Sequence, residues 1–364
     1  MSQQPSAVSR ELSPEVAKAQ QCDDAGKHTE AINHLVAGVR KNDVEAYTRL
    51  GKRLLVGDRA PLLTNDGLGF LVDASKRGGA EAAALLSVLF GIGLSPRHGL
   101  AAALDCLVLA AERGWPQAQA QIALLAGEPV TANAPRPAGS WRQLAKAIDL
   151  AAWQTPLPGT DLNDAPLIRC FPDFLSPAAC RWLIERARPL LTRALVYEAL
   201  ARQTMVHPTR TNNAATFNVF NSDFVCVLMQ RRMCACLGLP FAQLEPAAVL
   251  HYTEGRQITE HYDFVDPNTP NYEQEIAEKG QRIVTFLLYL NDDYAGGETE
   301  FTRLGITHKG RTGEGLFFSN ALEDGSSDVR TLHAGRPTTR GEKWIVSQFV
   351  RNRPVLGVGT LNAG

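Results

Sequence analysis

The stretch "GRQITEHYDFVDP", residues 255–267, places His261 and Asp263 two positions apart, with Tyr262 between them. Alternate residues of a β-strand point to the same face of a sheet, so this imidazole and this carboxylate can reach one metal ion while the tyrosine points away. The same pair is also compatible with two polar residues at an ordinary strand edge. One imidazole and one carboxylate leave a divalent ion short of ligands, so the choice depends on a third ligand from elsewhere in the chain.

The candidate for that third ligand is His333, in "VRTLHAGRP", 70 residues after Asp263. Several strand-like segments surround the two sites, separated by turns rich in glycine, aspartate and asparagine; they are "AAVLHY", "RIVTFLLYL", "GEGLFFSN" and "KWIVSQFV". Strands without long helices between them indicate an antiparallel sandwich or barrel. Two histidines and one carboxylate on one face would form the facial triad of non-haem iron oxygenases, which leaves three positions of an octahedral ion open.

Four blocks of the second half resemble the prolyl 4-hydroxylase type of iron- and 2-oxoglutarate-dependent dioxygenase. "LHYTEGRQITEHYDF" resembles the tyrosine, glycine and HxD strand of that family, and "RIVTFLLYLNDDYAGGETEF" its next long strand with the GGET turn. "GEGLFFSN" and "LHAGRPTTRGEKWIVSQFV" resemble its closing strands. The resemblance covers about residues 167–353 and implies a double-stranded β-helix, or jelly roll. It also implies that His261, Asp263 and His333 are the ligands of Fe(2+).

The resemblance further implies a 2-oxoglutarate site next to the metal. The family binds this co-substrate with a basic residue ten positions after the last histidine, which here is Lys343, and Thr285 and Tyr252 match positions whose hydroxyls assist there. A carboxylate buried in a sheet interior needs such a cationic partner. The alternatives are a surface lysine and two ordinary strand residues. The implied reaction converts 2-oxoglutarate to succinate and CO₂ while a C–H bond is hydroxylated, with L-ascorbate rescuing oxidised iron.

The substrate of this reaction is left open by three departures from the family pattern. Ile258 stands where many members have a second tyrosine, Phe349 where tryptophan is frequent, and Asn212 where serine is usual in a mobile substrate loop. We expect hydroxylation of a prolyl residue in a protein or peptide. The alternatives are the same chemistry on a free amino acid or other small molecule, and an inactive scaffold built on helical repeats.

The first 155 residues have a different pattern, rich in alanine and leucine and helical in character. Residues 73–93 and 109–127 superpose at a shift of 36 residues. The aligned pairs include Gly78 with Gly114 and Ala82 with Ala118, and a weaker earlier copy adds Ala46. A period in the mid-thirties with small residues at helix contacts and glycine at turns predicts stacked helix pairs. The segment resembles Sel1-like repeats of the tetratricopeptide class, and the alternative is a non-repetitive helical bundle.

The composition is that of a globular protein. Thirty-seven basic and 38 acidic side chains nearly cancel, so no electrostatic feature predicts a nucleic-acid or membrane partner. We expect a cytoplasmic protein, because the N-terminal sequence has no apolar core of signal-peptide length and no run of 18 apolar residues occurs. The seven cysteines are expected to be free, and the CxC of Cys234 and Cys236 to be part of an apolar helix.

These patterns together predict an α+β multidomain protein, an N-terminal α-helical repeat (α-solenoid) followed by a jelly-roll oxygenase domain. The expected divisions are a flexible N-terminus over 1–25, the repeat domain over 26–155, a linker over 156–166, the oxygenase domain over 167–355 and a tail over 356–364.

Overall fold

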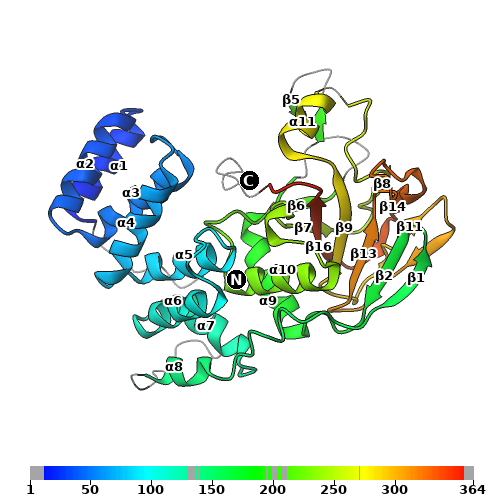
Figure 1. Cartoon of the computed structure of the whole chain (residues 1–364), viewed down its shortest axis with the longest axis horizontal. Coiled ribbons are helices and arrows are strands. Elements are labelled where there is room, and N and C mark those ends of the chain that lie inside the picture. The colour runs from blue at the N-terminus through cyan, green and yellow to red at the C-terminus, as the bar shows by residue number, and fades with distance from the viewer. Residues whose placement is uncertain are drawn as a thin grey trace. The chain divides into compact units, whose positions relative to one another are not determined.

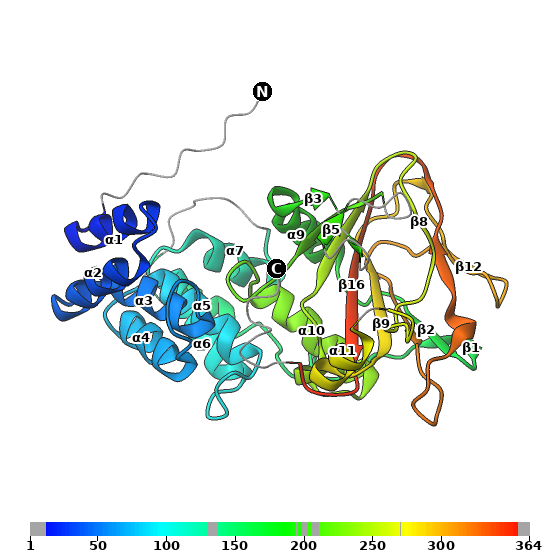
Figure 2. The same cartoon turned by 90° about the horizontal axis from the view of Figure 1, so that it is seen from above.

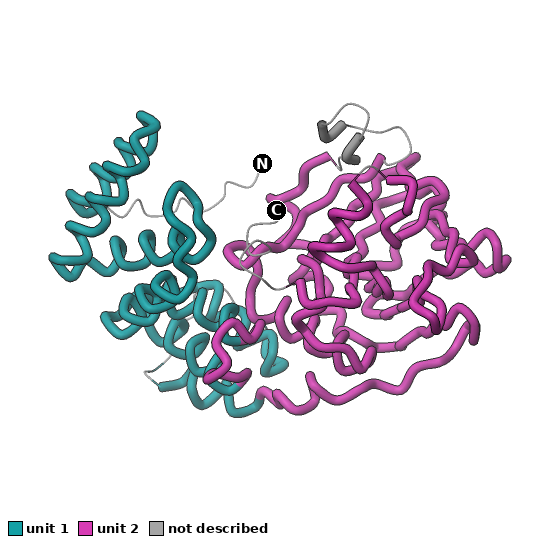
Figure 3. The backbone as a smooth tube through the Cα atoms, turned by 45° about the horizontal axis from the view of Figure 1, so that its top comes forward, with its two compact units in different colours: residues 1–90, 101–147 teal, residues 91–100, 148–364 magenta. Residues whose placement is uncertain are grey.

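The computed structural model describes residues 12–129, 137, 139–193, 196–198, 203–205, 211–269 and 271–355. The chain divides into two compact units, residues 1–90 with 101–147 and residues 91–100 with 148–364 (Figure 3). The expected tail over 356–364 lies outside the described residues.

The first unit consists of helices that follow one another in pairs (Figures 1 and 2). These are α1 (Pro14–Asp24), α2 (His28–Arg40), α3 (Val44–Val56), α4 (Thr64–Lys76), α5 (Ala80–Gly91), α6 (Leu100–Glu112), α7 (Pro116–Leu125) and α8 (Ser140–Ala145). Helices α2, α4 and α6 begin 36 residues apart, and so do α3, α5 and α7. The period found in the sequence is therefore the spacing of successive helix pairs.

The turn inside each pair and the contact beyond it explain why this period is visible in the sequence. Asn42, Gly78 and Gly114, one per pair, have φ angles of 58°, 95° and 81°. Glycine and asparagine are the residues that adopt this left-handed conformation at least cost. One turn into the next helix lie the fully buried alanines Ala46, Ala82 and Ala118. Small side chains at these positions let the paired helices approach closely.

The prediction that residues 1–25 form a flexible N-terminus is wrong for residues 14–24, because Pro14–Asp24 form helix α1. Val16 and Ala19 of this helix are buried in one cluster with Leu35 and Leu50 of the following helices. An 11-residue helix is marginal by itself and is stabilised by packing, which a short alanine- and glutamine-rich segment does not reveal. Residues 1–11 lie outside the described part of the chain.

The second unit is built on two larger antiparallel sheets. The eight-stranded sheet has the order β1 (Thr160–Asp164), β2 (Leu167–Phe171), β13 (Gly315–Ser319), β9 (Arg282–Tyr289), β16 (Lys343–Arg351), β7 (Ala248–Tyr252), β6 (Asn213–Thr216) and β3 (Thr192–Arg193). The four-stranded sheet has the order β12 (Ile306–His308), β11 (Thr299–Phe301), β14 (His333–Gly335) and β8 (Ile258–His261). Two short pairs complete the strands, β10 (Ala295–Gly296) with β15 (Thr338–Arg340) and β4 (Val196–Glu198) with β5 (Gln203–Met205).

The two larger sheets face each other across an apolar core, which gives the jelly roll its interior. Leu250, Leu287 and Phe318 of the eight-stranded sheet share this core with Phe301 of the four-stranded sheet. The rings of Phe301 and Phe318 meet edge to face, with centroids 5.0 Å apart. The structure thus confirms the expected α+β class, a helical region followed by an antiparallel β-sandwich.

Helices cover the other face of the eight-stranded sheet. They are α9 (Pro177–Ala187) and α10 (Phe224–Leu237). Helix α11 (Tyr272–Lys279), which buries no side chain, and the 3₁₀ turns η1 (Arg188–Leu190), η2 (Phe241–Gln243) and η3 (Val329–Thr331) lie elsewhere in the unit. Ser176 caps α9, accepting a hydrogen bond from the Ala179 amide at 3.3 Å. Gln230 of α10 donates to Gln348 of β16 at 2.8 Å. Among the described residues, no helix combines the length and apolarity needed to span a bilayer.

The segment 156–166, expected as a linker, contains strand β1, which pairs antiparallel with β2. Its sequence, "TDLND", has four exposed side chains and one half-buried side chain, so it has none of the apolar alternation that marks a strand. Backbone pairing along the sheet edge holds it in place. The second unit therefore begins before residue 167.

Candidate active site

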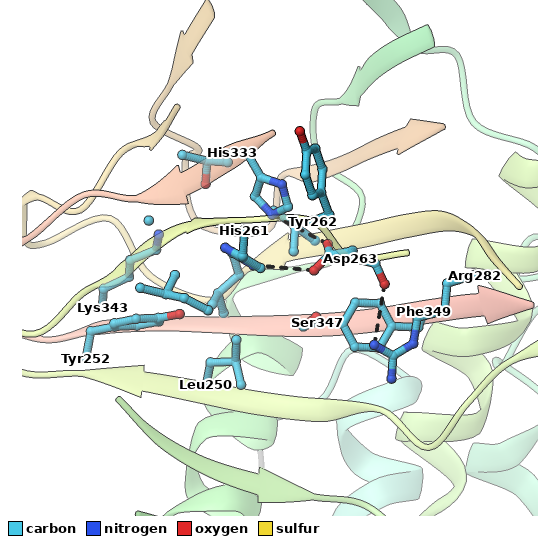
Figure 4. A pocket seen from close by; sticks show the side chains of 15 residues that line it. Leu250, Tyr252, His261, Tyr262, Asp263, Arg282, His333, Lys343, Ser347 and Phe349 are labelled. Atoms are coloured by element: carbon cyan, nitrogen blue, oxygen red, sulfur yellow. Dashed lines mark hydrogen bonds and ion pairs between the residues drawn. The ribbon is translucent and has the colours of Figure 1, made fainter. Parts of the chain in front are cut away.

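His261, Asp263 and His333 meet at one point between the two sheets (Figure 4). His261 ends β8, Asp263 follows two residues later, and His333 begins β14, where it lies directly opposite His261 in the strand register. His261 Nε2 lies 3.4 Å from one carboxylate oxygen of Asp263, and His333 Nε2 lies 3.5 Å from the other. The three predicted ligands thus form a cluster in which the donor atoms all lie within 4.8 Å of one another.

Backbone carbonyls fix the orientation of both imidazoles. The Nδ1 atom of His261 lies 2.9 Å from the carbonyl oxygen of Thr259, and Nδ1 of His333 lies 2.9 Å from that of Thr331. A carbonyl oxygen can only accept, so Nδ1 carries the proton in each ring and Nε2 keeps its lone pair. This arrangement is typical of metal-binding histidines, whose second nitrogen is held by a hydrogen bond.

The protonation states of the cluster also suit a divalent cation. Burial by itself would raise the pKa of Asp263, but His333, His261 and a hydrogen bond from Thr285 hold it below its usual value. Burial lowers the pKa of His333 to about 4. The site therefore contains a charged carboxylate and a neutral imidazole at neutral pH, as metal ligation requires. Two imidazole nitrogens and one carboxylate oxygen are the donor set of a non-haem iron(II) site.

A pocket of about 230 Å³ adjoins the three ligands, and Lys343 is part of its lining (Figure 4). The lysine is 3% exposed, and its ammonium donates to the carbonyl oxygen of Gly297 at 2.7 Å. Burial lowers the pKa of this ammonium to about 8. A buried cation whose hydrogen bond goes to a neutral acceptor provides a favourable position for an anion.

Tyr252 lies beside this lysine, as the family resemblance implies. It is paired with Lys343 in the register of β7 and β16, and its ring lies 5.4 Å from the ammonium. The side chain is buried and lines the same pocket. The structure therefore brings Tyr252 and Lys343 together with the side chains of His261, Asp263 and His333.

Thr285 has a different place from the one that the resemblance implied. It is fully buried and is not among the residues that line the pocket. Its hydroxyl donates to Asp263 Oδ2 at 2.8 Å and accepts from the side-chain amide of Asn320 at 2.9 Å. Thr285 and Asn320 thus orient the carboxylate ligand. The sequence offered no signal for Asn320, because it lies in the turn after β13 and approaches Asp263 only in the folded chain.

Arg282 is a second cation in the lining of the pocket, and it is already paired. Its guanidinium donates to the carboxylate of Glu245 at 2.7 and 2.9 Å and lies over the ring of Phe349 at 3.9 Å. Arg336, close by in sequence to His333, is paired with Glu300. Among the described residues that line the pocket, Lys343 is therefore the cation without a carboxylate partner.

Comparisons with known proteins agree with this geometry. The family model described as the 2OG-Fe(II) oxygenase superfamily matches residues 247–351. "Probable prolyl 4-hydroxylase 3" of Arabidopsis thaliana is 31% identical over 210 residues, which are 52% of this chain and 70% of that protein. "Prolyl 4-hydroxylase subunit alpha-1" of Rattus norvegicus is 30% identical over 190 residues, and the match spans about a third of its length, 35%, and 52% of this chain.

A solved structure is also similar in part. The viral collagen prolyl hydroxylase of Paramecium Bursaria Chlorella virus-1, in its 2OG complex, is 25% identical in sequence with a TM-score of 0.39. The alignment covers 50% of this chain and 94% of the viral chain.

Proposed function

This chain belongs to the prolyl 4-hydroxylase family of 2-oxoglutarate- and iron(II)-dependent oxygenases, and we propose that it hydroxylates a prolyl residue of a protein or peptide. The proposal rests on one observation: the three candidate iron ligands and a buried cation for the co-substrate line the same pocket. The Nε2 atoms of His261 and His333 and the carboxylate of Asp263 converge there, beside the buried ammonium of Lys343.

The roles of the side chains follow from their positions. His261, His333 and Asp263 would hold iron(II), which together with 2-oxoglutarate and O₂ supplies the oxidising power for hydroxylation of a C–H bond. Lys343 pairs with the carboxylate of 2-oxoglutarate that is remote from the metal, because this ammonium is buried and forms no direct salt bridge with a carboxylate of the described residues, its hydrogen bond going to the carbonyl oxygen of Gly297. Tyr252 lies against the same ammonium and shapes the pocket around the co-substrate.

The walls of the pocket limit the access of water. Leu250, Leu287 and Ile345 line it with aliphatic side chains and belong to the core between the sheets. A dry pocket strengthens the contact of Lys343 with its carboxylate and protects an oxidising site from side reactions. The walls formed by Ile258 and Phe349, which depart from the family pattern, define the part of the pocket in which substrate preference is decided.

Three finer features are also part of this proposal. L-Ascorbate serves as the reductant that restores iron(II) after turnovers without substrate, as in the family. The paired helices of the first unit, whose resemblance is to Sel1-like repeats, present a protein substrate. The protein acts in the cytoplasm, an expectation to be tested by fractionation of cells.

The test is turnover with defined substrates. The full chain is loaded anaerobically with iron(II) and supplied with 2-oxoglutarate, O₂ and proline-containing peptides, and products are analysed by mass spectrometry. We expect an added oxygen on a prolyl residue and a matching yield of succinate. His333→Ala should lose both iron and turnover, because the two remaining ligands hold the ion weakly. His28→Ala, which changes a histidine of helix α2, is the matched control and should retain both.

The outcomes distinguish the alternatives. Oxygen added to a free amino acid in preference to every peptide would move the substrate to the small-molecule class. Iron bound by the unchanged protein without any consumption of 2-oxoglutarate would support the inactive scaffold.

A further inference from the structure

A second group of potential metal ligands lies elsewhere in the jelly roll, formed by Cys170, His308 and Glu314. Cys170 is in β2 of the eight-stranded sheet, His308 ends β12 of the four-stranded sheet, and Glu314 directly precedes β13. One donor atom from each lies within 4.8 Å of the other two. None of the three residues lines the pocket of the iron site. The group therefore needs a separate explanation.

The distances within the group show how the three donors face one another. His308 Nε2 lies 2.6 Å from the carboxylate of Glu314 and 3.9 Å from the sulfur of Cys170. For Zn²⁺, bond lengths of about 2.0–2.3 Å to nitrogen, oxygen and sulfur place tetrahedral neighbours roughly 3.3–3.7 Å apart. The sulfur already lies close to that range. The carboxylate would have to move outward by less than about 1 Å to admit the ion.

We propose that Cys170, His308 and Glu314 form a second, structural metal site that binds a thiophilic divalent cation of the zinc class. A thiolate selects zinc-like ions over magnesium or calcium, and imidazole and carboxylate are compatible with the same ions. The side chains of His308 and Glu314 are 16% and 13% exposed, so an ion can reach them and a water molecule can complete the coordination. Because β2 and β12 belong to different sheets, the ion links the two layers of the sandwich.

The same three residue types can also form a nucleophilic cysteine site, and the surroundings of Cys170 argue against that alternative. A cysteine nucleophile needs a lowered thiol pKa. Here burial and the neighbouring Glu314 raise the pKa of the Cys170 thiol to about 12. The thiol therefore keeps its proton until a cation displaces it, which is how metal binding and proton release are coupled in thiolate sites.

Cobalt(II) titration of the metal-free full chain tests the proposal, because a thiolate ligand gives a near-ultraviolet charge-transfer band and the histidine–aspartate site does not. We expect two equivalents of cobalt, one of which produces the band. Cys170→Ser should lose the band and one equivalent while keeping the other. His261→Ala should show the reverse, with the band intact. Cys22→Ser, which changes a half-buried cysteine of the first unit, is the matched control and should keep both equivalents.

Several results would overturn the proposal. These are a single equivalent without the band in the unchanged protein, or a band that survives Cys170→Ser and so belongs to another of the seven cysteines. Rapid alkylation of Cys170 by iodoacetamide at neutral pH without metal would support the nucleophile instead. If Cys170→Ser loses both equivalents through misfolding, His308→Gln and Glu314→Gln decide. Each should remove or weaken the band, and a band of unchanged affinity in both would contradict the site.

Discussion

The hydroxyl of Thr285 lies between two buried polar groups, and this position sets how the carboxylate of Asp263 faces the pocket. It donates to Asp263 and accepts from Asn320, so its single proton is committed to the metal ligand. Hydrogen bonds of this kind orient metal ligands, and their loss commonly lowers metal affinity by about 10- to 100-fold. Thr285 therefore influences iron affinity directly and influences 2-oxoglutarate binding only through the metal.

Thr285→Val therefore separates the two roles. The change keeps the shape of the side chain and removes the hydroxyl. We expect iron(II) affinity to fall by about 10- to 100-fold, while the 2-oxoglutarate dissociation constant of the fully iron-loaded variant stays near that of the unchanged protein. Anaerobic titrations of each ligand measure the two quantities. Intact iron affinity together with weakened 2-oxoglutarate binding would instead return Thr285 to the co-substrate role that the family resemblance implied.

Lys343→Ala should have the opposite effect. The triad is unchanged, so iron binding should survive while 2-oxoglutarate affinity falls. Loss of one partner of a buried charged contact costs about 2–5 kcal/mol, or roughly 30- to several-thousand-fold in affinity. Lys309→Ala is the matched control, because Lys309 also lies against a tyrosine and donates to a backbone carbonyl, that of Tyr294, but is exposed and does not line the pocket. An unchanged dissociation constant in Lys343→Ala would place the carboxylate partner elsewhere.

The pH dependence of co-substrate binding gives Lys343 a second, independent readout. Its pKa is lowered to about 8, so the ammonium is charged below that pH and increasingly neutral above it. Binding of the carboxylate requires the charged form, and above about pH 8 affinity should fall by roughly tenfold per pH unit. Lys343→Arg, whose guanidinium does not titrate in this range, should remove that dependence even where its affinity is lower.

At the scale of single elements, the sequence predicted best where chemistry and strand periodicity coincide. The two-residue spacing of His261 and Asp263 correctly predicted that these side chains converge, and the family blocks led to His333 in β14. Strand alternation was not the reason, because Asp263 lies past the end of β8 and Tyr262, expected to point away, also lines the pocket. Prediction was weaker where an element owes its structure to partners. Helix α1 and strand β1 have little apolar pattern of their own, and Asn320 is brought to the site by a turn. Such features depend on tertiary contacts between distant segments.

Glu245 connects the ends of two central strands of the eight-stranded sheet. Its carboxylate pairs with Arg282 at the start of β9 and with Arg351 at the end of β16, and the side chain is 16% exposed. Glu245→Gln leaves both guanidinium groups without this carboxylate. We expect it to lower the free energy of unfolding by about 3–5 kcal/mol, measured by urea denaturation. Glu300→Gln breaks a more exposed pair with Arg336 and should lower the free energy of unfolding far less than Glu245→Gln does.

Acid should weaken the same connection. Burial by itself would raise the pKa of Glu245, but Arg282 and Arg351 hold it below its usual value. A depressed pKa adds stability above the unfolded-state value, near 4.3, and this stability is lost as the pH falls through the lower folded-state pKa. The unchanged protein should thus lose stability below about pH 4–5 more steeply than Glu245→Gln. Parallel pH profiles of the two proteins would show that other carboxylates dominate acid unfolding.

At the scale of the whole molecule, the sequence of the first unit predicts its architecture but no ligand, whereas the sequence of the second unit also predicts a chemical site. The 36-residue period of the first unit follows from turns and buried alanines, and these features specify architecture without specifying a ligand. The second unit contains all residues of the proposed iron and co-substrate site. Its boundary was harder to predict, because edge strand β1 is held by backbone pairing with β2 and has a polar sequence.

A fragment of residues 148–364 tests this division of labour. All residues of the site lie in it, and β1 still covers the edge of β2, so we expect it to bind iron and 2-oxoglutarate as the full chain does. A fragment that starts at residue 167 lacks β1 and should aggregate more readily through the exposed edge.

If the helical repeats present a protein substrate, removing them should raise KM for that substrate and leave kcat with a short peptide unchanged. Equal KM values for the fragment and the full chain would contradict the presenting role. Loss of iron binding by the fragment would show that the second unit requires residues 91–100, which cluster with it.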